Sequence, residues 1–418
     1  MTSALPDKSH LSEVSIVKFD NLLKLKDFNS PKRYEIVKKA VEMTLAKIGG
    51  IKAVLNSNVA LALVKPNLVV STPPELNLTT DPHVTASIAE LLLDSGVKRV
   101  VVAEYPALIH KGRDAFEVTL TKKFVEDVGA EVVYLDESEL VEVEVKEAEV
   151  HRLMKIPKIV MDADLILNVP KMKTHWLTKV TLGIKNLLGL LPSEEKLKYH
   201  REDIHQKLVD ILACLKDKLK LTIIDGIVAM EGLGPRCGDL VPMGLLVASR
   251  DVVAADAVAS YIMGFDPMEI QEIRIAHRRG LGNGDLREIV CKGSDPGEVR
   301  RHFKRASLDL VHVYENVQIY IGGACKACIG FTKAALEALA REGKLKEKLT
   351  IILGKDPPIP EFPQGKIIFV GDCVKDYAET YSGEAYFIEG CPPFRIYWKL
   401  PEILRVSTPL VLDGIHKK

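Results

Sequence analysis

Short apolar runs that read as β-strands alternate with helical patterns along almost the whole chain. The run Val59–Val64 precedes a helical pattern at Asp81–Gly96, which starts with Asp81-Pro82 and ends with a glycine. The run Arg99–Ala103 precedes another helical pattern, Thr121–Gly129. Such alternation is typical of α/β architecture. We therefore predict an α/β fold of mainly parallel sheets flanked by helices.

The chain is too long, at 418 residues, for one hydrophobic core. Asp295-Pro296-Gly297 interrupts the alternation, and a basic, helix-like stretch, Glu298–Arg305, follows. Beyond it lies a unit of about 100 residues, an ordinary domain size. We predict an α/β domain that binds an anion or substrate at residues 1–310, and a smaller α/β domain that carries cysteines at residues 311–418.

The charge balance excludes several classes of partner. Lys+Arg and Asp+Glu both number 57, so no global field favours nucleic acid or an anionic membrane. We find no signal-like segment at the amino terminus and no apolar run of membrane-spanning length, so we expect a cytoplasmic protein with reduced thiols. The Lys- and Glu-rich segment Arg341–Lys348 indicates a thermophile. A homo-oligomer is compatible with these features.

Four cysteines in the last quarter of the chain carry the clearest chemical signal: Cys325, Cys328, Cys373 and Cys391. They follow three strand-like runs, Val317–Ile321, Ile367–Val370 and Ala385–Ile388. Loops that leave the carboxyl ends of parallel strands converge on one sheet edge, so we expect the four thiols to meet. Four thiolates suit an iron–sulfur cluster or zinc.

The loops around these cysteines favour a [4Fe–4S] cluster over zinc. Pro392 follows Cys391 directly, as a proline does in many cluster-binding loops. Glycines precede the cysteines, which lets backbone N–H groups approach sulfur. A zinc staple, or thiols that bind nothing, remain the alternatives. Of the other cysteines, Cys237 lies in a glycine-dense loop, and a reactive role or simple loop packing both fit it.

A second group of candidate residues is basic. Lys65 follows an apolar strand-like run, and Lys171 and Lys173 lie in the basic loop that we expect after another such run. Lys185 lies among apolar residues, where an unpaired lysine is costly. We predict a pocket for a small phosphate or carboxylate, unless these lysines are simply exposed. We expect binding by Lys65, Asn67, Lys171, Lys173, Asn186, Gly232 and Gly234, and catalysis by His175, Lys185 and His200.

Acidic residues also lie at the ends of strand-like runs: Glu104, Asp225, Glu231, Asp251 and Asp256. Together with a histidine they could bind a hard metal ion or transfer protons. Asp251 equally fits the N-cap of the helical pattern that follows it.

Several of these segments resemble a known family. They are Lys65-Pro66-Asn67, Val169–His175, Thr181–Gly189, Asp225-Gly226 with Glu231–Pro235, and Ala248–Asp251. They look like the family catalogued as domain of unknown function 362, from about Val59 to Pro267. The resemblance implies an α/β domain and no established reaction. The sequence departs from the family at Cys237, where a small residue such as serine is expected, and the cysteine-bearing tail lies outside the family domain.

A fainter likeness is to the nickel-pincer lactate racemases, whose cofactor region has a histidine, Gly-x-Lys, a Pro-Gly turn and a later histidine. The order here is His175, Gly183-Ile184-Lys185, Gly189 and His200, without the Pro-Gly turn. This is an analogy at the level of the fold.

The sequence therefore predicts an iron–sulfur enzyme that acts on a small anionic substrate. The cluster would act as a redox centre, with an electron-transfer partner, or as a Lewis acid. One alternative is a racemase or isomerase that uses histidine and lysine as acid and base. The other is a non-catalytic binding protein stapled by zinc.

Overall fold

The chain folds into two compact units that are interleaved in sequence. The computed structural model describes residues 11–55, 59–107, 110–198 and 203–412. The first unit holds the described residues of Met1–Thr174, Thr178–Glu231 and Leu240–Lys304. The second holds His175–Leu177, Gly232–Asp239 and the described part of Arg305–Lys418. The domain division at residues 310 and 311 stays a prediction, since these units are defined by contacts and not by one cut in the chain.

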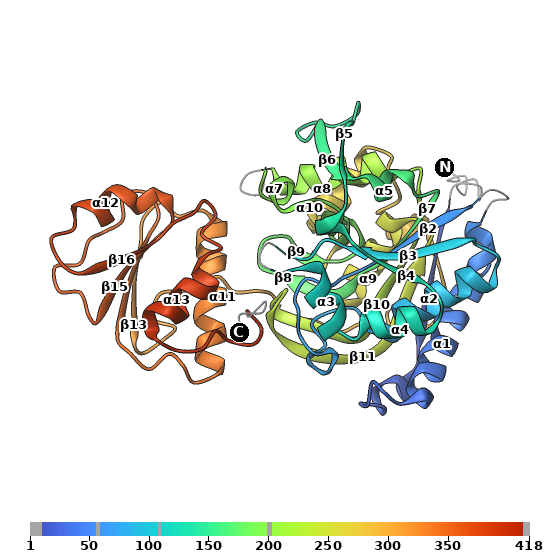
Figure 1. Ribbon diagram of the computed structural model, residues 1–418, viewed down its shortest axis with the longest axis horizontal. Helices are drawn as coiled ribbons and strands as arrows, with labels where there is room; N and C mark the ends of the chain where they lie inside the picture. Colours follow the sequence, from blue (N-terminus) through green and yellow to red (C-terminus); the bar gives the residue numbers. More distant parts are fainter. Residues whose placement is uncertain (1–10, 56–58, 108–109, 199–202, 413–418) are drawn as a thin grey trace, which may run out of the picture. The chain divides into compact units, whose positions relative to one another are not determined.

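A large mixed sheet forms the centre of the first unit, with the strand order β12-β1-β11-β10-β7-β2-β3-β4 (Figure 1). Its strands are β1 (Ser12–Lys18), β2 (Leu61–Pro66), β3 (Arg99–Glu104), β4 (Glu131–Tyr134), β7 (Leu165–Val169), β10 (Leu219–Leu233), β11 (Cys237–Ser249) and β12 (Ile289–Gly293). Two short strands, β8 (Lys171–His175) and β9 (Lys179–Thr181), extend it beside β10. A separate antiparallel pair consists of β5 (Leu140–Glu144) and β6 (Leu153–Pro157).

Most neighbouring strands of this sheet are parallel. β2 pairs in parallel with both β3 and β7, and β7 pairs in parallel with β10. The exception is β11, which is antiparallel to β1 and joined to β10 by only three residues, so that β10 and β11 form a hairpin. The carboxyl ends of β2, β3 and β7 therefore share one sheet edge.

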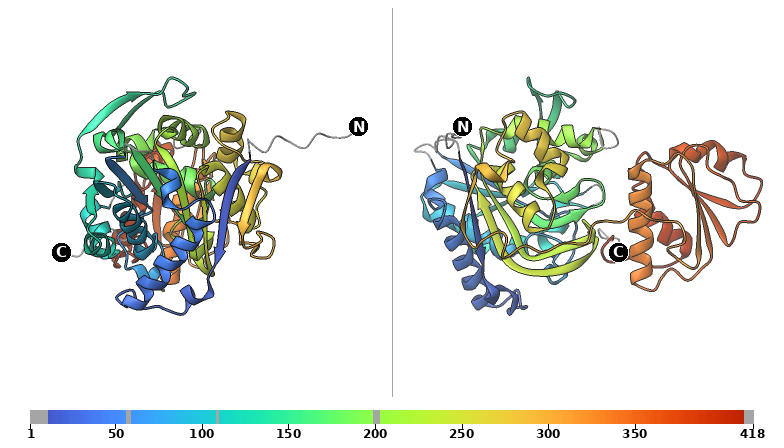
Figure 2. Two further views of the ribbon diagram at one scale, coloured as in Figure 1. Left: turned by 90° about the vertical axis from the view of Figure 1, so that its right-hand side faces the viewer. Right: turned by 180° about the vertical axis from the view of Figure 1, so that it is seen from behind.

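Helices cover both faces of this sheet (Figures 1 and 2). On one face α1, α2 and α4 pack together, and on the other α6, α8, α9 and α10 do so. The helices of this unit are α1 (Pro31–Ala46), α2 (Pro82–Asp94), α3 (Gly112–Val118), α4 (Thr121–Asp127), α5 (Lys158–Asp162), α6 (Gly183–Asn186), α7 (Ser193–Leu197), α8 (Ile204–Leu215), α9 (Val252–Ile262) and α10 (Gln271–Arg278). Among the described helices, none combines the length and apolar character needed to cross a bilayer.

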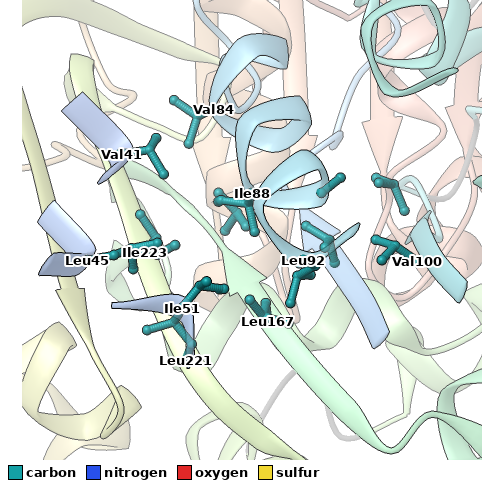
Figure 3. Packing of buried hydrophobic residues seen from close by; sticks show 14 of the residues in the cluster. Val41, Leu45, Ile51, Val84, Ile88, Leu92, Val100, Leu167, Leu221 and Ile223 are labelled. Atoms are coloured by element: carbon teal, nitrogen blue, oxygen red, sulfur yellow. The ribbon is translucent and has the colours of Figure 1, made fainter. Parts of the chain in front are cut away.

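The main core of this unit lies between the sheet and helices α1 and α2 (Figure 3). Alternate residues of each strand face it, such as Val100 of β3, Leu167 of β7 and Ile223 of β10. Helix α2 contributes Val84, Ile88 and Leu92, which are spaced four residues apart and so lie on one side of the helix. Intervening strand residues such as Ile166 are also fully buried, because helices cover the opposite face.

The second unit has its own sheet of four parallel strands in the order β13-β14-β15-β16. These strands are β13 (Val317–Ile321), β14 (Leu349–Leu353), β15 (Lys366–Val370) and β16 (Ala385–Ile388), and the helices are α11 (Lys326–Arg341), α12 (Lys375–Thr380) and α13 (Ile396–Leu404). Helices α11 and α13 join the sheet in one core, to which Trp176, Leu233 and Cys237 also belong. A smaller cluster around Phe369 packs against α12.

The predicted fold class is confirmed, because both sheets are mainly parallel and flanked by helices. Two local expectations are wrong. The basic segment after β7 is the buried strand β8 and not a loop, because its polar heads find partners inside the protein. The stretch Glu298–Arg305 is a turn followed by irregular chain and not a helix.

Candidate functional site

Buried charged side chains gather at the carboxyl edge of the large sheet. Lys65, near the end of β2, forms a fully buried ion pair with Glu104, the last residue of β3. The Lys65 ammonium also donates to Oδ1 of Asn186 at 3.0 Å. Burial lowers the pKa of Lys65 and raises the pKa of Glu104 to about 7, although each charge opposes the shift of the other. Desolvation is costly for such a pair, so its further hydrogen bond matters.

Asparagine side chains connect this ion pair to Lys173. Nζ of Lys173 donates to Oδ1 of Asn67 at 2.9 Å, and Nδ2 of Asn67 donates to Oδ1 of Asn186 at 3.2 Å. Nδ2 of Asn186 in turn donates to Oδ1 of Asn168 at 2.8 Å. The chain of hydrogen bonds joins β2, β7, β8 and α6, so it fixes the geometry of this edge.

A second ion pair lies on β8 and β10. Nζ of Lys171 is 2.9 Å from Oδ2 of Asp225, and both side chains are buried. The same carboxylate oxygen accepts the backbone N–H of Asp81 at 2.8 Å, and Asp81 is paired with the buried Arg33. Lys171 is thus held by the sheet and by the start of α2.

The structure brings together five of the predicted binding residues: Lys65, Asn67, Lys171, Lys173 and Asn186. The three ammonium groups among them already have partners within the protein, so a ligand would have to compete for them. This geometry is that of a rigid, polar sheet edge whose charged groups are already hydrogen-bonded, and less that of a site whose groups are left for a ligand. Asp251 lies elsewhere: it follows the oppositely directed β11 and caps α9 by accepting the N–H of Val253 at 2.9 Å.

Lys185 differs from the other lysines of this region. It lies in α6 with 9% of its surface exposed, and within the described part of the chain its ammonium makes no hydrogen bond and no ion pair. Burial lowers the pKa of Lys185 to about 8, and the nearby Glu272 carboxylate opposes that shift. An amine of this pKa is partly deprotonated near neutral pH and can act as a base or a nucleophile.

Two more buried lysines lie close enough to Lys185 to interact with its charge. Lys196 donates to the carbonyl oxygens of Tyr105 and Pro106, the latter at 2.8 Å. Lys207 donates to three carbonyl oxygens, of Glu195, Lys196 and Lys198, at 2.5 to 3.0 Å. Burial is the main cause that lowers the pKa of each to about 7, and the charge of Lys185 contributes to the same shift. This part of the unit is therefore rich in buried amines.

The segment that carries Lys185 is tied down at both ends. The Asp256 carboxylate accepts the backbone N–H of Gly183 at 2.6 Å and that of Ile184 at 2.8 Å. Burial raises the pKa of Asp256 to about 8, although these two N–H groups oppose the shift. A side chain at position 183 would place its Cβ 2.7 Å from Oδ1 of Asp256, so only glycine allows this approach. With Asn186 held in the network, Lys185 sits on a fixed backbone.

Other predicted site residues lie elsewhere or outside the description. His175 belongs to the second unit, where its Nδ1 accepts the N–H of Leu177 at 3.0 Å. Gly232 lies near the end of β10 and Gly234 in the turn between β10 and β11, and both belong to the second unit. The N–H of Gly234 donates to the carbonyl oxygen of Gly232 at 2.8 Å. His200 lies outside the described residues. His205, in the first unit, pairs with Glu272 at 2.6 Å.

The four tail cysteines occupy three loops at one edge of the second sheet. Cys325 is the N-cap residue of α11 and Cys328 lies in its first turn, after β13. Cys373 follows β15, and Cys391 follows β16. Because these strands are parallel, the three loops leave the same edge.

Direct contacts join the three loops. The N–H of Gly390 donates to Oδ1 of Asp372 at 2.6 Å, which links the loops of Cys391 and Cys373. A Cβ at Gly371 would lie 3.4 Å from Sγ of Cys328, so the loop after β15 runs directly beside that sulfur. Burial raises the pKa of Cys328, and the neighbouring Cys325, Cys373 and Cys391 raise it further.

These sulfurs lie near one another but do not form a ready ligand shell. Among the described residues, no three His, Cys, Asp or Glu side chains stand in a metal-ligating arrangement. The described cysteines form no disulfide. A cavity of about 440 Å³ opens beside Cys373 and is also lined by Lys355, Asp356, Asp376, Tyr377 and Thr380. Solvent and small molecules can therefore reach Cys373.

Comparison with known proteins places the chain in a family. A family model described as domain of unknown function, DUF362, matches residues 62–261. A thylakoid-associated protein of Synechocystis sp. is 31% identical over 243 residues, which are 57% of this chain and 73% of that protein. The chain belongs to the DUF362 family. The DUF362 match contains Lys65, Lys185 and Asp256, and it ends before the four tail cysteines.

Two solved structures show weaker similarity to this DUF362 protein. A lactate racemase apoprotein from Thermoanaerobacterium thermosaccharolyticum has a TM-score of 0.38 and 13% identity, over 62% of this chain and 59% of that one. A protein from Thermotoga maritima has a TM-score of 0.25 and 10% identity, over 47% of this chain and 50% of that one. At these scores neither similarity carries an argument about the site.

Sequence reasoning missed two of the buried lysines in this DUF362 protein. The burial of Lys207 could have been predicted from the sequence, because Lys207 lies four and eight residues before Ile211 and Leu215 on the apolar side of α8. The burial of Lys196 could not have been predicted, because it results from packing against the segment that follows β3.

Proposed function

We propose that this DUF362 protein is an enzyme that binds an iron–sulfur cluster and acts on a small anionic substrate. Cys325, Cys328, Cys373 and Cys391 would hold one [4Fe–4S] cluster. The observation that carries the proposal is that three loops at one edge of a parallel sheet bring three other thiols close to the buried Cys328.

The donor set fits such a cluster. All four candidate donors are sulfur, which iron–sulfur clusters and structural zinc both accept. Cys328 is buried beside three groups that would repel its thiolate, so it would ligate only with a metal whose positive charge offsets that repulsion. Gly371, with φ of +90°, keeps the space next to Sγ of Cys328 free of a side chain. When bound, a [4Fe–4S] cluster transfers single electrons, and four cysteine ligands favour this role over that of a Lewis acid.

The protein's own contribution at the cysteine edge is electrostatic. Cys325 and Cys328 lie at the amino end of α11, a helix of 16 residues. The positive end of its dipole stabilises negative charge on thiolates there. A redox role also implies an electron-transfer partner. The expected cytoplasmic location suits reduced thiols and stays part of this proposal.

In the first unit, the substrate site would centre on Lys185. A buried amine without a protein partner is available to a ligand, whereas Lys65, Lys171 and Lys173 are engaged. The same observation favours the second candidate function, a racemase or isomerase in which Lys185 moves a proton. Zinc at the four cysteines in place of the cluster would favour the third candidate function, a non-catalytic binding protein that zinc stabilises.

The test is anaerobic purification followed by iron, sulfide and zinc analysis and electron paramagnetic resonance. Anaerobic handling is needed because Cys373 lines an open cavity. We expect about four iron and four sulfide per chain. Cys325→Ser should lower the iron content, and Cys214→Ser, at a thiol far along the chain in α8, should not. A colourless protein with one zinc would exclude the cluster.

A further inference from the structure

The buried lysines of the first unit differ in whether their ammonium groups have hydrogen-bond partners. Six of the described residues belong to this set: Lys65, Lys171, Lys173, Lys185, Lys196 and Lys207. Five of them have their ammonium groups hydrogen-bonded to carboxylate, amide or backbone oxygens. Among these six lysines, Lys185 alone has neither a hydrogen bond nor an ion pair in the described structure, although nine-tenths of its surface is buried. A buried polar group without a partner needs an explanation.

The surroundings of Lys185 favour the neutral amine. The main cause is burial, which lowers the pKa of Lys185, and the ammonium group has no hydrogen bond in the described structure that would offset it. The Glu272 carboxylate of α10 raises the pKa of Lys185 but does not reach ion-pair distance. The Asp256 carboxyl group of α9 accepts two backbone N–H groups instead of pairing with Lys185. Desolvation is one of the means by which proteins make a lysine nucleophilic.

We propose that Lys185 is a nucleophile that forms an imine with the carbonyl group of a small oxo acid. The inference rests on the proposed function, because it names the class of anionic substrate for the same site. A buried amine without a partner inside the protein can add to a carbonyl carbon, and the carboxylate is that of the small anionic substrate in the proposed function.

The chemical step needs no reagent beyond the substrate. The Nζ lone pair attacks the carbonyl carbon, the C=O π-bond opens, and a proton moves from nitrogen to oxygen to give a carbinolamine. The C–O bond then breaks as the hydroxyl takes up a proton and leaves as water. Nitrogen releases its remaining proton, so amine and carbonyl yield imine and water. Such an imine draws electrons from the adjacent carbon, which suits proton abstraction there.

The fold holds this amine in place through residues that do not touch the substrate. Asp256 fixes the N–H groups of Gly183 and Ile184, and Asn186 is fixed by Lys65 and Asn168. Residues on both sides of Lys185 are therefore anchored, and Asp256 is a positioning residue. A fixed amine loses less entropy when it attacks.

The experiment uses pyruvate as the probe, with sodium cyanoborohydride to reduce any imine to a stable amine. The full-length protein is incubated, digested and mapped by mass spectrometry. We expect labelling of Lys185 at roughly ten times the occupancy of exposed lysines such as Lys198. Lys185→Arg should lose the label and Lys198→Arg should keep it. Mapping of the unaltered protein gives the answer even if Lys185→Arg does not fold.

Two results would overturn the inference. Labels spread over exposed lysines, with Lys185 unmodified, would show that Lys185 is not a nucleophile. Equal labelling of Lys185 by acetone, which lacks the carboxylate, would remove the oxo-acid assignment. Neither result depends on the cluster, because trapping needs no electron transfer and no turnover. A protein with its cluster but no adduct would thus refute this inference and leave the iron–sulfur proposal standing.

Discussion

Gly189 covers the buried ion pair between Lys65 and Glu104. Its carbonyl accepts the N–H of Tyr105 at 2.8 Å, and a Cβ there would lie 2.1 Å from Oε1 of Glu104 and 2.5 Å from Nζ of Lys65. We expect Gly189→Ala to force the pair apart and to lower the free energy of unfolding by about 3 kcal/mol, as broken buried ion pairs do. Urea unfolding measures this loss.

The matched control is Gly297→Ala, where the nearest atom to a new Cβ is the Asp295 carboxylate at 3.0 Å. That carboxylate belongs to an exposed side chain whose Oδ1 accepts the N–H groups of Gly297 and Glu298 at the surface, so we expect a loss below about 1 kcal/mol. Equal losses in the two variants would contradict the importance of the ion pair.

Asp256 should make stability depend on pH in a definite direction. Its pKa is raised from 3.8 to about 8 in the folded protein, mainly by burial. The folded state therefore keeps a proton that the unfolded state releases, and stability falls as pH rises from about 4 to about 8. Asp256→Asn cannot titrate, so it should be less stable than the natural protein at pH 5 and lose less stability by pH 9. Urea unfolding at both pH values tests this, and a constant difference between the two proteins would refute it.

Single residues show how far the sequence could predict the site. Lys65, Lys171 and Lys173 were predictable because they follow apolar strands that end at one edge. Their partners were not, because Asn67, Asn168 and Asn186 meet only through the packing of β2, β7 and α6. Lys185 is of the same residue type as Lys65, Lys171 and Lys173, and only the hydrogen bonds in the structure distinguish it from them.

At the scale of elements, α11 depends on an aromatic contact within the second unit. Gly330 of α11 lies so close to Trp176 that a Cβ would be 2.2 Å from the indole, and Phe331 meets the same ring edge-on with centroids 5.4 Å apart. Trp176→Ala should therefore destabilise this unit by about 3–5 kcal/mol. Near-ultraviolet circular dichroism during urea unfolding would report the loss. Trp398→Ala, at a partly buried ring, should cost less, and the reverse order would contradict this packing.

Elements were predictable where burial and apolar sequence coincide. The strands β13 and β16 have the predicted bounds, and β15 differs by one residue, because these parallel strands are almost wholly apolar. The strand β8 was not predictable, because Lys171 and Lys173 read as loop residues until Asp225 and Asn67 supply their partners.

At the scale of the whole molecule, the second unit is not one continuous piece of chain. Its core includes Trp176, Leu233 and Cys237, which come from segments far earlier than Arg305. No local sequence signal marks this interleaving, because turn residues look alike whether they face solvent or enter another core.

We therefore expect a fragment of residues 305–418 to be less stable than the same residues in the full chain. It lacks the Trp176 side chain, whose loss alone costs about 3–5 kcal/mol. Hydrogen–deuterium exchange of α11 in the fragment and in the full chain measures the difference. The full-length Trp176→Ala protein should move in the same direction, and equal protection of α11 in all three would show that the early segments add nothing.

The interleaved core also sets an order of events during protein synthesis. His175–Leu177 and Gly232–Asp239 leave the ribosome long before α11 and α13 have been translated. Trp176 and Leu233 must then wait without their native neighbours, exposed to water or to transient non-native contacts. The second unit can close only after α13 has been translated. A chain stalled late in translation would carry an apolar, unfinished surface of the kind that chaperones and proteases recognise.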